Sequence, residues 1–227
     1  MQVSDKTSKQ RTEVRQASLV EAALQLAAQR SPADITTGEL AQAVGITQGA
    51  VFRHFASKEA IWLAALDWTT TALMGRLQEV ADNAYKPAAP NAPPDIAAEV
   101  PSLHALRAVF MAHVAFVVAY PGVPRVIFQE LQQPQDTALK AHVRQLMQQY
   151  RALLMRLMLQ AQKEQLIANN ADLTGACVLF IGSIQGLVMQ AMLSGDVAAI
   201  TRLAPSVFAI YERGLGADAP TLLERTA

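Results

Sequence analysis

The sequence predicts an all-α fold, and three observations support this. Apolar residues recur at helical spacing, most clearly over 136–166, where they form one stripe. No stretch alternates apolar and polar residues for long enough to predict a half-buried strand. The 227 residues are 52% hydrophobic with a mean hydropathy of +0.18, which is typical of a well-buried globular chain.

Turn and cap residues divide the first part of the chain into short helices. We expect helices over 12–30, 37–44, 48–54 and 58–82. Thr36 and Glu39 have the spacing of a capping box at the start of the second helix. Gly45 can adopt the positive φ that ends this helix, and Thr47 and Ser57 are suitable N-caps for the next two helices.

A proline-rich segment, residues 83–101, separates this part from the rest of the chain. It holds five of the eleven prolines, so a helix cannot run through it, and we expect a loop or semi-rigid linker at a domain boundary. Beyond it, helical periodicity predicts further helices near 102–119, 123–131, 136–166, 171–194 and 197–213.

Composition excludes several classes of protein. Nineteen basic and nineteen acidic residues balance, so the whole chain shows no charge excess that would favour a polyanionic partner. Cys177 is the single cysteine and has no partner for an intramolecular disulfide, and the first twenty residues lack a signal peptide; both favour the cytoplasm. The uncharged run 173–195 could cross a bilayer by length, but its polar residues and the lack of a basic flank favour a buried packing helix and no membrane.

Residues 36–58 have the spacing of a helix-turn-helix, two short helices joined by a glycine turn. The second helix of such a motif enters the DNA major groove while the first braces it. The residues expected on the buried side are Leu40, Val44, Ile46, Val51 and Phe55. Those expected to face outward are Gln48, Gly49, Ala50, Arg53 and His54.

The outward residues divide by chemistry. Gln48 and Arg53 suit base edges, and Gly49 and Ala50 allow close approach, with Ala50 able to touch a thymine methyl. We expect the phosphate contacts to come from Thr36, Thr37, Thr47, His54 and Lys58. The alternative is an ordinary pair of packed helices, because glycine turns are common in all-α proteins. Residues 1–60 hold only seven basic against six acidic side chains, and the excess lies at the N-terminal end, where residues 1–15 hold four basic against two acidic side chains. Residues 1–11 are predicted to form a flexible arm that could supplement phosphate binding.

The segment "ITTGELAQAVGITQGAVFRHFASKEAIW" (35–62) resembles the DNA-binding signature of TetR-type transcriptional repressors. The resemblance covers about residues 12–62 and adds Phe52 to the DNA-facing residues. Phe52 stands where the family usually has a tyrosine whose hydroxyl reaches a phosphate, so this contact is missing here. The resemblance implies a DNA-binding domain over 1–57 and an effector-binding and dimerisation domain over 58–227.

Such proteins are all-α homodimers that bind an operator and release it when a small effector binds. The resemblance therefore implies a dimer through the helices near 171–194 and 197–213, where Gly175, Gly182 and Gly186 permit close helix packing. It implies a pocket between about 60 and 160 for a hydrophobic or aromatic effector. The candidate wall residues are Trp68, Phe110, His113, Phe116, Phe128, Tyr150, Leu154 and Met158. Each is also consistent with ordinary core packing, and His113 with a buried histidine that bonds a core partner.

Two competing classes remain. An enzyme is disfavoured because the sequence lacks HExxH, GxSxG and phosphate-loop motifs, and we expect no cofactor. The four histidines form no i, i+3 or i+4 pair, so we expect no metal site. The second competitor is a DNA-binding protein of the same fold without a small-molecule effector, of the nucleoid-occlusion type.

Overall fold

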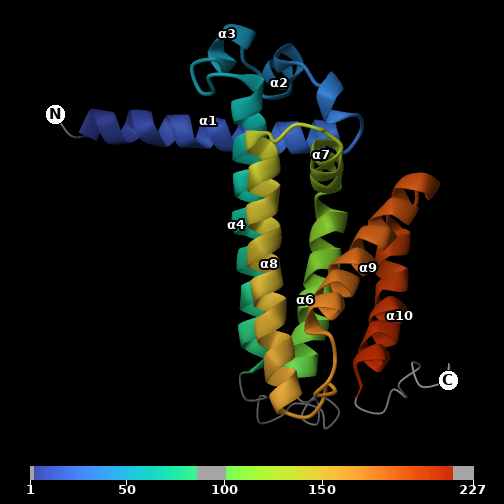
Figure 1. Cartoon of the computed structure of the whole chain (residues 1–227). Helices are drawn as coiled ribbons and strands as arrows, with labels where there is room; N and C mark the ends of the chain where they lie inside the picture. The colour runs from blue at the N-terminus through green and yellow to red at the C-terminus, as the bar shows by residue number, and fades with distance from the viewer. Residues whose placement is uncertain (1–2, 86–100, 217–227) are drawn as a thin grey trace. The chain divides into compact units, whose positions relative to one another are not determined.

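Every regular element in the described part of the chain is a helix (Figure 1). The computed structural model describes residues 3–85 and 101–216. Its helices are α1 (Val3–Ala27), η1 (Pro32–Asp34), α2 (Thr37–Ala43), α3 (Gln48–Val51), α4 (Lys58–Ala84), α6 (Pro101–Ala119), α7 (Gly122–Leu131), α8 (Ala138–Lys163), α9 (Leu173–Ser194) and α10 (Ala198–Leu215). This confirms the all-α fold. The loop predicted over 83–101 falls almost entirely on 86–100, outside the described residues.

The chain forms two compact units, and helices α4 and α8 each contribute to both. The first unit contains residues 1–72 and 119–147, and the second contains 73–118 and 148–227. The first unit therefore extends past residue 57, where the sequence predicted the end of the DNA-binding domain. It does so because α7 packs against α1 and η1.

In the first unit, α1 begins at Val3, so residues from 3 onward in the predicted flexible arm are helical. The apolar face of α1 packs into the core with Leu19 and Ala23 fully buried. The start of α7 lies directly on α1: a Cβ added at Gly122 would be 2.0 Å from the Leu24 carbonyl oxygen. Only glycine allows this approach of two backbones.

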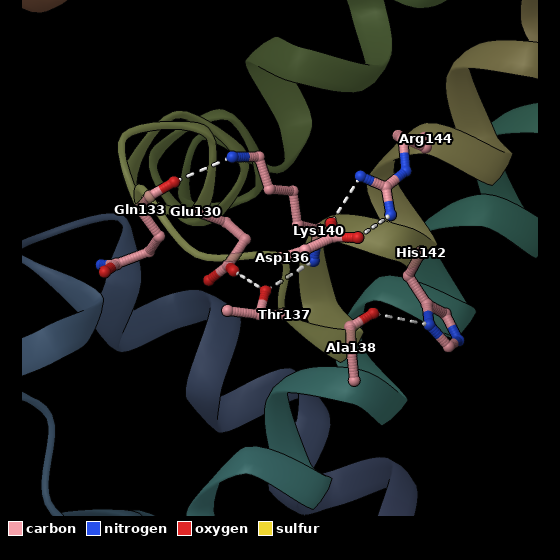
Figure 2. Close-up of polar contacts among 8 residues, drawn as sticks. All are labelled: Glu130, Gln133, Asp136, Thr137, Ala138, Lys140, His142 and Arg144. Atoms are coloured by element: carbon pink, nitrogen blue, oxygen red, sulfur yellow. Dashed lines mark hydrogen bonds and ion pairs between the residues drawn. The ribbon is translucent and has the colours of Figure 1, made fainter.

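Polar contacts fix the turn between α7 and α8 in the first unit (Figure 2). Thr137 caps α8 by accepting a hydrogen bond from the Lys140 backbone N–H (3.0 Å), and its own hydroxyl donates to the buried Glu130 carboxylate. Asp136 pairs with Arg144 at 2.6 Å. The cap explains why α8 begins at residue 138 rather than at 136, as the sequence predicted.

The second unit is built around an aromatic cluster. Phe110, Phe180 and Phe208 come from α6, α9 and α10, and the Phe110 ring lies 5.2 Å from Phe180 and 5.3 Å from Phe208 between centroids. Tyr211 adds a ring 5.4 Å from Phe180 and donates a hydrogen bond to the Ala176 carbonyl (3.2 Å). These contacts hold α9 and α10 side by side on the core (Figure 1).

Helix α9 buries one of its faces in the core and leaves apolar residues exposed on another. Both α9 and the segment 102–119 of α6 are long and apolar enough to span a membrane, and 44% of each lies buried. The exposed apolar side chains of α9 and α10 include Val178, Leu179, Met189, Met192, Leu193, Leu203 and Ile210. We call these seven residues the α9–α10 apolar face. Exposed apolar side chains are unfavourable in water, and the α9–α10 apolar face gathers several of them.

Candidate DNA-binding surface

Local capping builds the two short helices of the motif. The Thr36 hydroxyl accepts a hydrogen bond from the Glu39 N–H (3.2 Å), and the Glu39 carboxylate accepts from the Thr36 N–H (2.8 Å), which confirms the predicted capping box. Gly45 has a φ of +68° and makes the turn, as predicted. Thr47 then caps α3 by accepting from the Ala50 N–H at 3.3 Å. Each step uses residues within three positions of one another.

Glu39 remains ionised because of these contacts. Hydrogen bonds from Thr36, first from its side chain and then from its backbone, lower the pKa of Glu39 from its usual value of 4.5 to about 2. Arg30 adds an ion pair at 2.7 Å and contributes to the same shift. This acid stabilises the start of α2, where the helix dipole favours negative charge. Arg30 is consequently engaged within the protein.

Helix α3 is shorter than the predicted 48–54, but its last turn continues in tighter hydrogen bonds. The Arg53 N–H donates to Ala50 O (3.2 Å) and the His54 N–H donates to Val51 O (2.9 Å), both three residues back. Gln48, Gly49, Phe52 and Arg53 are exposed along this segment. Phe52 has 49% of its surface exposed although it is aromatic and apolar. These residues form a contiguous polar and aromatic surface that can meet a nucleic-acid groove.

Two predicted contacts lie differently from the expectation. The predicted outward orientation of Ala50 is wrong: it is only 8% exposed, because α3 packs against α2 closely enough to bury both Ala50 and Val51. His54 is half-buried, and its Nδ1 is buried without a hydrogen-bond partner in the described structure. Its backbone carbonyl accepts a hydrogen bond from the Gln16 side chain.

The remaining predicted phosphate contacts lie on the surface but already have partners. Thr36 and Thr47 use their hydroxyls as caps, and Thr37 Oγ1 accepts a hydrogen bond from Gln48 Nε2 at 2.8 Å. Lys58 Nζ donates to the Ala33 carbonyl at 2.8 Å. These side chains would have to exchange such bonds for phosphate oxygens.

Two residues that the sequence did not single out hold the motif on α1. Arg15 Nη1 donates to Val44 O (3.2 Å), where α2 ends, and Gln16 Nε2 donates to His54 O (2.9 Å), in the turn that follows α3. Gln129 of α7 adds a third support by accepting hydrogen bonds from the Ser31 hydroxyl and the Ala33 N–H. These contacts join positions 29 to 98 residues apart, so no local pattern could reveal them.

Most predicted pocket residues lie in the core of the second unit. Phe110, His113, Phe116, Tyr150, Leu154 and Met158 are all buried there. His113 Nδ1 lies 3.1 Å from Tyr150 Oη in a hydrogen bond, and burial lowers the pKa of His113 from 6.5 to about 4. Trp68 and Phe128 belong to the first unit and are half-buried.

A capped helix-turn-helix with an exposed second helix defines a DNA-binding regulator of the helix-turn-helix class. Sequence comparison agrees, since the family described as bacterial regulatory proteins, tetR family, matches residues 19–65. The family described as tetracyclin repressor-like, C-terminal domain, matches residues 128–207, and the two together cover more than half of the chain. The chain therefore belongs to the TetR family of transcriptional regulators.

Among curated relatives, the chain is 30% identical over 93 residues to the nucleoid occlusion factor SlmA of Vibrio vulnificus strain YJ016. This match covers 41% of the chain and 40% of the relative, so the chain spans less than half of that protein's length. Solved structures show the fold over most of the chain. The fatty acid degradation regulator FadR of Bacillus halodurans gives a TM-score of 0.73 at 16% identity, covering 88% of this chain and 96% of that one. FadR of Bacillus subtilis in complex with stearoyl-CoA gives 0.71 at 16% identity, covering 87% and 98%.

Proposed function

We propose that this regulator is a ligand-responsive repressor that acts in the cytoplasm, binds a palindromic operator as a homodimer, and releases it when a small hydrophobic or aromatic effector binds. The observation that carries the proposal is the set of exposed residues Gln48, Gly49, Phe52 and Arg53, in a motif that Arg15 and Gln16 hold on α1 through Val44 and His54. Gln48 pairs with adenine and Arg53 with guanine through bidentate hydrogen bonds in the major groove.

The α9–α10 apolar face supports the homodimer. Leu193 is 78% exposed, and Val178 and Ile210 are each 63% exposed, so one copy of the chain leaves large apolar side chains in water. Gly182 and Gly186 lie on α9 with open space where a Cβ would be, which permits close approach of a second helix. A dimer through this face places two recognition helices for a two-fold symmetric operator.

The effector is proposed from the second unit, whose core residues are apolar and aromatic and belong to a fold that in one relative holds stearoyl-CoA. Helix α4 is the proposed lever, because it begins directly after the motif and continues into the second unit. An effector that favours one tilt of α4 changes operator affinity by thermodynamic linkage. The alternative is a DNA-binding protein of the nucleoid-occlusion type without an effector. The partial match to such a factor is consistent with this alternative but does not favour it.

Selection from random genomic fragments, followed by sequencing, would give the operator. On that operator we expect Arg53→Ala to weaken binding about 10- to 100-fold and to relax the preference at one base pair. Lys58→Ala should weaken binding more evenly across sequences. Arg76→Ala is the matched control, because Arg76 is an exposed arginine on α4 about 27 Å along the helix from Lys58. Unchanged preference in Arg53→Ala would contradict the recognition-helix assignment.

The dimer and the effector have separate tests. Ile210→Glu should convert a dimer to a monomer in sedimentation at micromolar concentration, whereas Leu131→Glu, at an exposed leucine of α7, should not. Stearoyl-CoA and uncharged aromatic compounds would then be titrated into the operator complex. Release of DNA by at least one of them supports a ligand-responsive repressor. Release by none of them favours the effector-independent alternative.

A further inference from the structure

A groove of about 760 Å³ lies along α1 in the first unit, apart from the exposed face of α3. Helix α1 forms one side of it over residues 17–29, and Trp68 of α4 and residues 119–121 form the rest of the wall. Of the residues predicted to hold an effector, Trp68 lines this groove. The groove is therefore distinct from the buried aromatic core of the second unit.

The wall of the groove is firmly placed. Gly122 follows Pro121 and rests on the backbone of Leu24 and Ala28, so the segment 119–121 is anchored to α1 on one side. Trp68 and Tyr120 contact each other edge to face, with ring centroids 4.9 Å apart and ring planes at 74°. Val20 and Leu24 of α1 line the same groove and make its wall apolar. A ligand enters a site that already has its shape, which lowers the entropic cost of binding.

The charge that lines the groove is negative. Glu21 is the single charged side chain among its lining residues in the described structure, and it is exposed at the rim. Gln25 lies one turn further along α1, and its Nε2 donates to Glu21 Oε1 at 3.2 Å, which orients the carboxylate. The carboxylate lines the same groove as the two aromatic rings, so a cation bound there is attracted by its charge and by the negative faces of the rings. The same groove disfavours an anion of equal size.

We infer that this groove binds a hydrophobic cation that carries aromatic rings, with Glu21 beside the positive charge and Trp68 and Tyr120 against the rings. This site goes beyond the proposed function and does not depend on it. The apolar wall takes the hydrophobic part of the ligand, as in most small-molecule sites, and the one carboxylate sets the sign of its charge.

The test compares two ions of the same shape and opposite charge, tetraphenylphosphonium and tetraphenylborate, by isothermal titration calorimetry with the full chain and no DNA. We expect the cation to bind at least about tenfold more tightly than the anion. Glu21→Gln should abolish most of this preference. Glu13→Gln is the matched control, because it removes an exposed carboxylate from the same helix outside the groove.

A second variant tests where the ligand binds while Glu21 remains unchanged. Ala17→Trp places a large ring in the groove at an exposed position, so the fold is preserved while the space is filled, and binding of the cation should fall about tenfold or more. Equal affinity for the two ions, or a preference that survives both Glu21→Gln and Ala17→Trp, would overturn the inference. Operator binding is measured separately and reports on the proposed function. Failure of the cation site can therefore be distinguished from failure of the proposed repressor function.

Discussion

The helix-turn-helix and the aromatic core of the second unit use their polar side chains in opposite ways. In the motif, Gln48 and Arg53 stay exposed on a scaffold of caps whose partners lie close in sequence. In the core, His113 and Tyr150 are buried and hydrogen-bond each other across 37 residues of chain. The first arrangement leaves polar side chains on the surface, whereas the second buries two polar groups that hydrogen-bond each other.

This difference decides whether a substitution in each region changes DNA binding or the stability of the fold. Phe52 and Arg53 are exposed at the end of the motif, so we expect changes there to affect binding rather than folding. The closely packed contacts behind it, and the core of the second unit, should respond in stability instead. Substitutions in the two regions can break this contrast, and the largest effects should come from the closely packed contacts.

Gly122→Ala should give the largest loss of stability. The added Cβ would lie 2.0 Å from the Leu24 carbonyl oxygen and 3.0 Å from the Ala28 nitrogen, and backbone atoms cannot move aside as a flexible side chain can. We expect the free energy of unfolding in urea to fall by about 4 kcal/mol. The contact between α1 and α7 supports the motif, so operator binding should weaken as well.

Gly75→Ala provides the control for this experiment. Gly75 lies inside α4 with open space around the added Cβ, so alanine should be neutral or stabilising by up to about 1 kcal/mol. A Gly122→Ala protein as stable as wild type would show that α7 does not rest on α1 as closely as the structure indicates.

The buried pair should give the next largest effect, seen as a pH dependence. Burial lowers the pKa of His113 from 6.5 to about 4, so the unfolded chain binds a proton between these values that the folded chain excludes. Stability therefore decreases as pH falls through this window. The contribution is about 3 kcal/mol between pH 7 and pH 4, from 1.36 kcal/mol per pKa unit.

The double variant His113→Phe, Tyr150→Phe isolates this contribution, because removing both partners leaves no buried polar group unpaired. Its free energy of unfolding should fall less steeply with acid than that of wild type, at equal protein concentration. His142→Gln, at a histidine of α8 that is only partly buried, should keep the wild-type slope. Parallel slopes in all three proteins would contradict a neutral, buried His113.

The sequence predicted most of the fold and the scaffold of the DNA-binding surface because these depend on local spacing. Thr36 with Glu39, Gly45 and Thr47 act within a few residues, and all behave as predicted. The predicted exposure of Ala50 was wrong because the burial of a residue in one helical turn depends on which neighbouring element packs against it. The supports from Gln16 and Gln129 could not be predicted, since their partners lie far away in the chain.

The pocket was harder to predict for a physical reason. Apolar and aromatic residues at helical spacing serve equally as core or as ligand wall, and the sequence does not distinguish the two. Phe110, Tyr150 and Met158 pack in the core as fully buried side chains. Trp68 instead lines a groove on α1, whose other walls come from parts of the chain that no local pattern brings together.

Phe52→Tyr should produce the smallest effect on DNA affinity. It adds a single hydroxyl to the exposed surface of the motif and should leave stability unchanged. Phe52 is 49% exposed at the end of α3, so a hydroxyl added to its ring enters water at almost no cost, and the unfolding midpoint should stay unchanged. If the ring faces the operator, the hydroxyl can donate to a phosphate oxygen and tighten binding by about 1 kcal/mol, roughly fivefold. Phosphate contacts carry no base information, so the gain should be equal on operator and on random DNA. Equal affinity of both proteins would place the ring away from the DNA backbone, and a gain on the operator alone would assign it to a base edge.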